Sequence, residues 1–182
     1  LAEERRLPVV SATGSCAMGR QLAPRIAARM GRAILELGGN NGAIVCPSAH
    51  LQLVERAVLF AATGTAGQRC TTLRRLLVHE AVYAELVPRL RGLYARLPVG
   101  NPLDPNTLVG PLIDEAAFEA MQSALAEARA AGGRVAGGDR VDVPGCEGGW
   151  YVRPALVEGL EQTELVHRET FAPILYVLRV GS

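Results

Sequence analysis

The segment at residues 64–72, GTAGQRCTT, contains the side chain of this sequence that is best placed to react. Its cysteine, Cys70, follows a glycine-punctuated turn and a nearly all-apolar helical run at residues 51–62. A thiolate is a nucleophile, and a fixed backbone turn can stabilise the oxyanion that its attack on a carbonyl creates. A lone cysteine is more often an inert apolar residue of the core. Both interpretations stay open on this segment alone.

A carboxylate in an apolar segment is the second candidate. Glu36 lies in the run at residues 32–37, RAILEL, which predicts a buried strand. An unpaired buried carboxylate is costly, and burial raises its pKa toward the range that suits a general base. A glutamate on an edge strand that faces water fits this segment equally well.

A glycine-serine turn is the third candidate. Residues 13–15, TGS, follow a predicted short buried strand at residues 8–12 and precede a helical pattern with an apolar residue at every fourth position from Met18 to Met30. The backbone N–H groups of a helix start could bind a phosphate there. A plain connection between strand and helix is the alternative.

The elements that must position these residues alternate along the chain. Apolar runs predict further strands at residues 43–46, 75–79, 151–157 and 174–180. Helical periodicity predicts helices at residues 51–62, 80–96 and 114–131, with residues 98–111 an ordered loop and residues 135–149 rich in turns. This order predicts an α/β fold, with a mainly parallel open sheet covered by helices on both faces.

Single residues refine the helix predictions. Ser48 and Asp114 are expected to cap their helices, and residues 51–62 to be mostly buried because only three of them are polar. Pro24 is expected to delay, kink or break the first helix, and Pro88 to bend the third.

Composition excludes several classes of function. The chain has 182 residues, of which 49% are hydrophobic, and 19 cations balance 18 anions to a net charge of +1, so no nucleic-acid partner is expected. Every cation is arginine, which rules out a Schiff-base lysine within these residues. The four cysteines and three histidines lack metal-site spacing, so no metal is expected. No apolar run reaches the roughly 20 residues of a membrane span, and a reducing cytoplasm is the expected location.

Four segments, in order, resemble motifs of the NAD(P)-dependent aldehyde dehydrogenase family. They are residues 13–19 (TGSCAMG, against T-G-S-x-x-x-G), 36–39 (ELGG), 67–70 (GQRC, against G-Q-x-C) and 169–173 (ETFAP, against E-x-F-G-P). The finer pattern at residues 40–41 (NN), 64–72 and 169–173 is similar to the α-aminoadipic semialdehyde (antiquitin-like) branch.

The resemblance implies a role for individual residues. Cys70 corresponds to the nucleophile that forms a thiohemiacetal and then a thioester, and Glu36 to the base that activates the hydrolytic water. The residues that correspond to cofactor contacts are Gly14, Ser15, Leu37, Glu169 and Phe171. Arg69 and Thr71 flank the nucleophile where the branch receives its substrate, although a surface salt bridge is the alternative for Arg69.

The resemblance also implies partners and boundaries. The cofactor would be NAD, with NADP not excluded, the substrate a carboxylate-bearing semialdehyde, and the parent a homo-oligomer (dimer or tetramer). Residues 1–37 would form the tail of the NAD-binding domain, and residues 38–182 a catalytic domain that is incomplete at its C-terminus. The family's oxyanion-hole asparagine and ribose-binding lysine have no counterpart here, so we expect a fragment that is inactive by itself. Ala172 replaces a usual glycine, and Cys16 a common threonine.

Two other functions remain compatible with the sequence. A CoA-acylating semialdehyde dehydrogenase would pass the acyl group to CoA, which makes a base at Glu36 dispensable. A non-catalytic structural domain that keeps the scaffold would have no fast-reacting thiol. The glutamate argues against the first alternative and the intact motif residues against the second.

Overall fold

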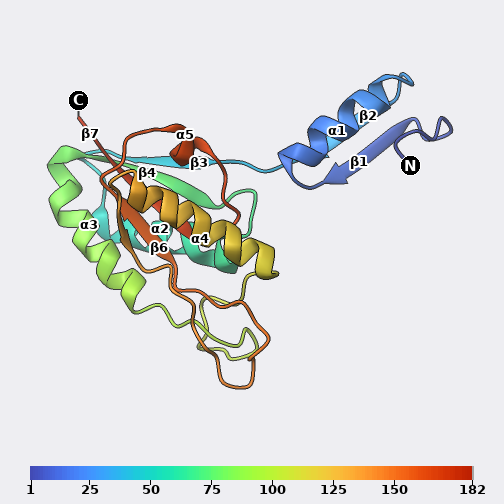
Figure 1. Ribbon diagram of the computed structural model, residues 1–182. Coiled ribbons are helices and arrows are strands. Elements are labelled where there is room, and N and C mark those ends of the chain that lie inside the picture. The colour runs from blue at the N-terminus through green and yellow to red at the C-terminus, as the bar shows by residue number, and fades with distance from the viewer. Residues whose placement is uncertain (182) are drawn as a thin grey trace. The chain divides into compact units, whose positions relative to one another are not determined.

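The computed structural model describes residues 1–181 and divides into two compact units, residues 1–39 and 40–182 (Figure 1). Each unit is described by itself. Within residues 1–181, no helix combines the length and the apolar character needed to cross a bilayer. The same residues contain no group of three or more His, Cys, Asp or Glu side chains that could hold a metal ion.

The first unit is a β-α-β element. Its members are β1 (Val9–Thr13), α1 (Cys16–Ala27) and β2 (Arg32–Glu36), and the two strands pair in parallel. The predicted burial of these strands is wrong, because Val9 is 45% and Ile34 54% exposed. A two-stranded sheet packed on one helix leaves one of its faces open. The helix starts at once after Ser15 and continues through Pro24, so the predicted late start or break is also wrong.

The second unit contains a five-stranded sheet in the order β3-β4-β7-β6-β5. Its strands are β3 (Asn41–Val45), β4 (Leu73–His79), β5 (Arg134–Ala136), β6 (Ala155–Glu158) and β7 (Ile174–Val180). All neighbours pair in parallel except β5 and β6. The predicted mainly parallel α/β sheet is therefore confirmed.

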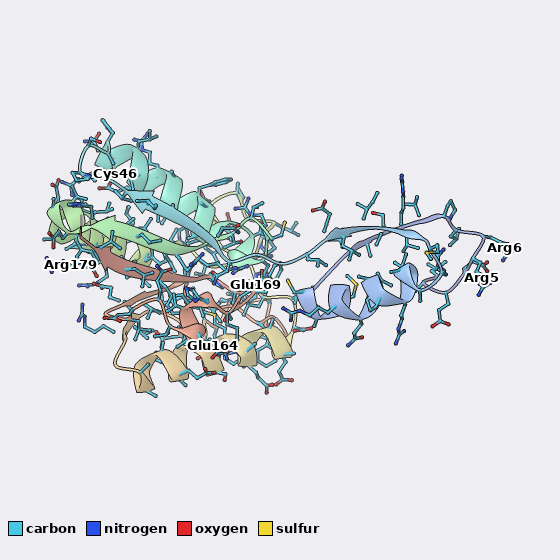
Figure 2. All side chains as sticks on the ribbon, turned by 90° about the horizontal axis from the view of Figure 1, so that it is seen from above. Arg5, Arg6, Cys46, Glu164, Glu169 and Arg179 are labelled. Carbon is cyan, nitrogen blue, oxygen red and sulfur yellow. The ribbon has the colours of Figure 1, made fainter. Side chains whose placement is uncertain are left out.

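Helices cover both faces of this sheet. They are α2 (Leu51–Thr63), η1 (Gly64–Gly67), α3 (Glu80–Ala95), α4 (Glu115–Ala130) and α5 (Glu164–His167). Figures 1 and 2 show α2 and α3 on one side of the sheet and α4 on the other. Residues 174–178 of β7 are all buried, as a strand requires when both of its faces are covered.

Local details depart from the sequence predictions. The cap of α2 is His50 and not Ser48, because the His50 Nδ1 accepts a hydrogen bond from the Leu53 N–H. Asp114 caps α4 as predicted, accepting from the Ala117 N–H at 2.9 Å. Only three residues of α2 are buried, and Phe60 is 70% exposed, so the predicted burial of this helix is wrong.

Two elements of the second unit are not predicted by the sequence, and one predicted strand is shorter than expected. The short strand β5 and the helix α5 were not expected. The predicted strand at residues 151–157 is shortened to β6, which follows Pro154, a residue with no backbone N–H to donate to a ladder. Pro88 lies inside the continuous helix α3.

Candidate active site

The turn before Cys70 has an uncommon backbone conformation. Thr65, Ala66 and Gly67 follow one another with φ angles of 56°, 50° and 69°, all in the left-handed region. Non-glycine residues in this region are strained by roughly 1–3 kcal/mol each, and such strain persists only where the surroundings fix it. The neighbouring contacts must therefore determine the shape of this turn.

One constraint is the close approach of Gly67 to the loop at residues 169–173. A Cβ atom at Gly67 would lie 2.5 Å from the carbonyl oxygen of Ala172, so only a glycine fits between the two backbones. A second constraint is Gln68, whose Nε2 donates to the Pro111 carbonyl at 3.2 Å and whose Oε1 accepts from the Ile113 N–H at 2.9 Å. These contacts fix the turn from two sides.

Hydrogen bonds also fix the backbone around Cys70. The Asn41 Nδ2 donates to the carbonyls of Cys70 (2.7 Å) and Thr72 (2.9 Å). The Thr72 Oγ1 accepts from the Arg69 N–H, and the Thr72 N–H donates to the Arg69 carbonyl, both at 3.1 Å. The cysteine itself is exposed and forms no disulfide. An exposed thiol on a fixed backbone is not an inert core residue, and this geometry suits a nucleophile.

A buried arginine joins this turn to the loop at residues 169–173. Arg74 is 2% exposed, and its Nη2 donates to the carbonyls of Gly67 and Arg69, each at 3.2 Å. Its Nη1 donates to the Thr170 carbonyl at 2.6 Å. Burial lowers the pKa of this guanidinium, while the charge of Glu169 opposes that effect.

Sequence reasoning missed Arg74. Its one signal is a charged residue in the largely apolar strand β4, and the adjacent Arg75, which is only half-buried, gives the same signal.

Two predicted cofactor contacts lie on the loop that Arg74 holds. The Glu169 carboxylate pairs with the Arg74 guanidinium at 3.4 Å, and the side chain of Glu169 is 23% exposed. The Phe171 ring lies beneath the same guanidinium, 5.3 Å from its carbon atom, and Phe171 is 45% exposed. Figure 2 labels Glu169 at the end of the sheet where this loop lies. The structure thus brings Glu169 and Phe171 into contact with the residue that holds the Cys70 turn.

The predicted substrate residue Arg69 packs against Phe60 of α2. Its guanidinium stacks 5.1 Å from the Phe60 ring centre and donates to the Phe60 carbonyl at 3.2 Å. Within residues 1–181 it forms no ion pair, so the salt-bridge alternative finds no support there. Thr71 is exposed beside it.

Arg69 borders a cavity of about 410 Å³ with mainly apolar walls. The other lining residues are Arg56, Leu59, Phe60, Thr63, Gly64, Thr65, Leu97, Thr107 and Leu108.

The first unit brings its own predicted residues together. The Gly14 N–H donates to the Glu36 carbonyl at 3.0 Å, and the Ser15 Oγ accepts from the Met18 N–H at 3.1 Å. The strand end that carries Glu36 therefore adjoins the start of α1, and the Glu36 side chain is exposed. Leu37 packs against α1, because a Cβ atom at Gly19 would lie 2.5 Å from its Cδ1. The role of Glu36 as the base that activates the hydrolytic water stays a prediction.

The 12-residue helix α1 begins at a turn suited to an anion. Ser15 caps it, and its first turn contains no acidic residue. The free N–H groups of such a helix start, together with its dipole, favour a phosphate. The Cys16 thiol lies 3.7 Å from the Gly38 carbonyl and ties this turn to the segment after β2.

The fit of Gly67 against the 169–173 loop predicts a large effect of one methyl group. We expect Gly67→Ala to lower the free energy of unfolding by about 2–5 kcal/mol, from left-handed strain and overpacking together. Gly132→Ala is the matched control, because Gly132 has φ 88° but nothing within 4 Å of an added Cβ. That control should cost only about 1–2 kcal/mol. Urea unfolding monitored by circular dichroism measures both, and equal losses would contradict the close approach.

The sequence of this chain is similar to known proteins over its whole length. The family model described as "Aldehyde dehydrogenase family" matches residues 1–182. The chain is 48% identical over 181 residues to the α-aminoadipic semialdehyde dehydrogenase of Mus musculus, covering 98% of this chain and 33% of that protein. It thus spans about a third of the length of this curated relative.

Solved structures agree along the whole chain. A 3,6-anhydro-L-galactose dehydrogenase in complex with NADP superposes with a TM-score of 0.95 at 33% identity, covering 100% of this chain and 39% of that one. The betaine aldehyde dehydrogenase of Staphylococcus aureus in complex with NAD+ gives 0.95 at 25% identity, with coverage of 100% and 36%. Because that family model matches residues 1–182, this chain belongs to the aldehyde dehydrogenase family.

Proposed function

We propose that the protein carrying this chain oxidises an aldehyde to a carboxylic acid with NAD or NADP, using Cys70 as the nucleophile. The observation that supports this most is the exposed Cys70 on a backbone fixed by Asn41, Thr72 and Arg74. We further propose that residues 1–37 belong to the cofactor domain and residues 38–182 to the catalytic domain, in a reducing cytoplasm that keeps the thiol free.

The first step is attack of the Cys70 thiolate on the aldehyde carbon. The carbonyl oxygen becomes an oxyanion, which needs a hydrogen-bond donor. The Cys70 N–H is suited to this role, because it donates no hydrogen bond within residues 1–181. It belongs to the same peptide unit as the Arg69 carbonyl, which accepts from Arg74 and Thr72. The two groups of a trans peptide point in opposite directions, so this N–H points away from Arg74.

The second part of the reaction needs the cofactor and a water molecule. NAD, when bound, supplies the acceptor for the hydride that leaves the thiohemiacetal carbon, which turns the Cys70 adduct into a thioester. Gly14 and Ser15 at the start of α1 would hold the pyrophosphate, and Glu169 the ribose hydroxyls. Leu37 and Phe171 would border the nicotinamide. Glu36 would take a proton from the water that hydrolyses the thioester, which releases the acid and the free thiol.

The substrate proposed is a semialdehyde with a distant carboxylate, such as α-aminoadipic semialdehyde. Arg69 adjoins the nucleophile, lacks an acidic partner within residues 1–181, and borders the 410 Å³ cavity. A guanidinium binds a carboxylate through paired hydrogen bonds. The 48% identical mouse protein is named for this substrate, which supports the same choice.

The nucleophile is tested by removing its sulfur. We expect Cys70→Ala in the full-length protein to reduce aldehyde-dependent NADH formation more than about a thousandfold, because no other group can form the thioester. Cys146→Ala, at a half-buried cysteine of another loop, should retain activity. Product analysis with and without CoA separates acid formation from acyl transfer to CoA. NADH formation that survives in Cys70→Ala would refute the proposal.

The substrate class is tested at Arg69. We expect Arg69→Met to raise KM for the carboxylate-bearing semialdehyde by about 10-fold to 100-fold, the loss of one charged hydrogen-bonded pair. KM for an uncharged aldehyde of the same length should change less than about threefold, since that substrate has no carboxylate to bind. Steady-state kinetics with both aldehydes measures the difference. An equal rise for the two substrates would contradict carboxylate recognition by Arg69.

A further inference from the structure

We propose that Arg74 is a positioning residue that sets the direction of the Cys70 N–H and places Glu169 relative to it. This inference rests on the proposed function, because it concerns the oxyanion donor and the cofactor carboxylate of the same site. Arg74 touches neither substrate nor cofactor in this account. It acts through the peptide groups and the carboxylate that it binds.

Arg74 joins the turn before Cys70 to the loop at residues 169–173. Its contacts include two carbonyls of the turn before the nucleophile and three acceptors of the loop after α5. The two carbonyls of the turn are those of Gly67 and Arg69. The three acceptors of the loop are the carbonyls of Thr170 and Ala172 and the carboxylate of Glu169. The two segments lie about 100 residues apart in sequence, and a single buried guanidinium connects them.

Peptide planarity couples this contact to the direction of the Cys70 N–H. The Arg69 carbonyl and the Cys70 N–H belong to one rigid trans peptide, so the direction of one fixes the direction of the other. Arg74 Nη2 holds that carbonyl at 3.2 Å from the buried side. The N–H is thereby turned toward the exposed side, where the Cys70 side chain lies. A preorganised donor stabilises an oxyanion without reorganising during the reaction.

Arg74 also binds the loop at residues 169–173. Arg74 Nη1 binds the carbonyls of Thr170 and Ala172, the residues on either side of Phe171, while its Nη2 pairs with Glu169. The position of the proposed ribose-binding carboxylate is therefore coupled to that of the nucleophile turn. A change at Arg74 should affect both ends of the reaction, the oxyanion and the cofactor.

These contacts require an arginine and not a lysine. Arginine presents five N–H donors in a planar fork and stays protonated when buried, whereas lysine offers a single ammonium group. One ammonium cannot reach carbonyls of two segments and a carboxylate in the arrangement found here. If Arg74 contributed to stability alone, its planar guanidinium would not need to bind both carbonyls of the turn, those of Gly67 and Arg69.

The test compares two reactions of the same thiol in the full-length protein. Alkylation of Cys70 by iodoacetamide displaces iodide and forms no oxyanion, whereas acylation by p-nitrophenyl acetate passes through one. Peptide mass spectrometry assigns the alkylation rate to Cys70 among the four cysteines. We expect the ratio of ester hydrolysis to alkylation to fall about tenfold or more in Arg74→Met, as when an oxyanion donor is weakened. KM for NAD should rise in the same variant.

Two further variants make the result decisive. Arg74→Lys keeps the positive charge but lacks the planar guanidinium, so its ratio of ester hydrolysis to alkylation should stay well below that of the wild type. If Arg74→Met does not fold, Arg74→Lys decides alone. Arg91→Met removes another ion pair to a buried carboxylate, that of Glu158 in β6, and Arg91 lies in α3, outside both the cysteine turn and the loop at residues 169–173. Its ratio should match the wild type even if its stability falls.

The outcomes separate this inference from the proposed function. A ratio within twofold of wild type in Arg74→Met, or full recovery in Arg74→Lys, would overturn the positioning role while aldehyde oxidation by the wild type stands. Absence of NADH formation by the wild type would instead overturn the proposed function. The ester-to-alkylation ratio needs no cofactor or aldehyde, so it reports on Arg74 in either case.

Discussion

The buried guanidinium of Arg74 is the interaction on which the local architecture around Cys70 depends. Taking a cation out of water is costly unless charge and hydrogen bonds compensate it, and here a carboxylate and several carbonyls do so. Of the three consecutive left-handed residues before Cys70, Arg74 binds the carbonyl of Gly67, while Gln68 and the close approach to Ala172 fix the rest of the turn. Strain at residues 65–67 and burial of a charge are thus two aspects of one arrangement, which leaves the thiol exposed on a rigid backbone.

The sheet explains why such distant segments meet. Strand β4 lies between β3 and β7, so the residues before β4, the residues before β7 and the start of β3 come to the same edge of a parallel sheet. The cysteine turn precedes β4, the loop with Glu169 precedes β7, and Asn41 opens β3. Topology therefore delivers a thiol, a carboxylate and an amide to one place before any side-chain contact is considered.

Local signals predicted much of this from sequence, while long-range packing did not. The alternation of strands and helices, the Asp114 cap and the glycine turn are encoded by neighbouring residues, and the structure contains them. The burial of α2 was overestimated because a nearly all-apolar run does not tell which face is covered, and Phe60 lies on the open one. The role of Arg74 could not be predicted, because most of its acceptors are backbone carbonyls, which have no signature in the sequence.

The central claim is that Cys70 carries the acyl group and that Glu36 releases it. Trapping the intermediate tests this most directly: Glu36→Gln in the full-length protein is mixed with NAD and the semialdehyde, quenched in acid and analysed by peptide mass spectrometry. The account predicts an acyl adduct of the substrate on the peptide that contains Cys70, accumulating because the water is no longer activated. An adduct on Cys16, Cys46 or Cys146, or none on any cysteine while NADH is formed, would contradict it.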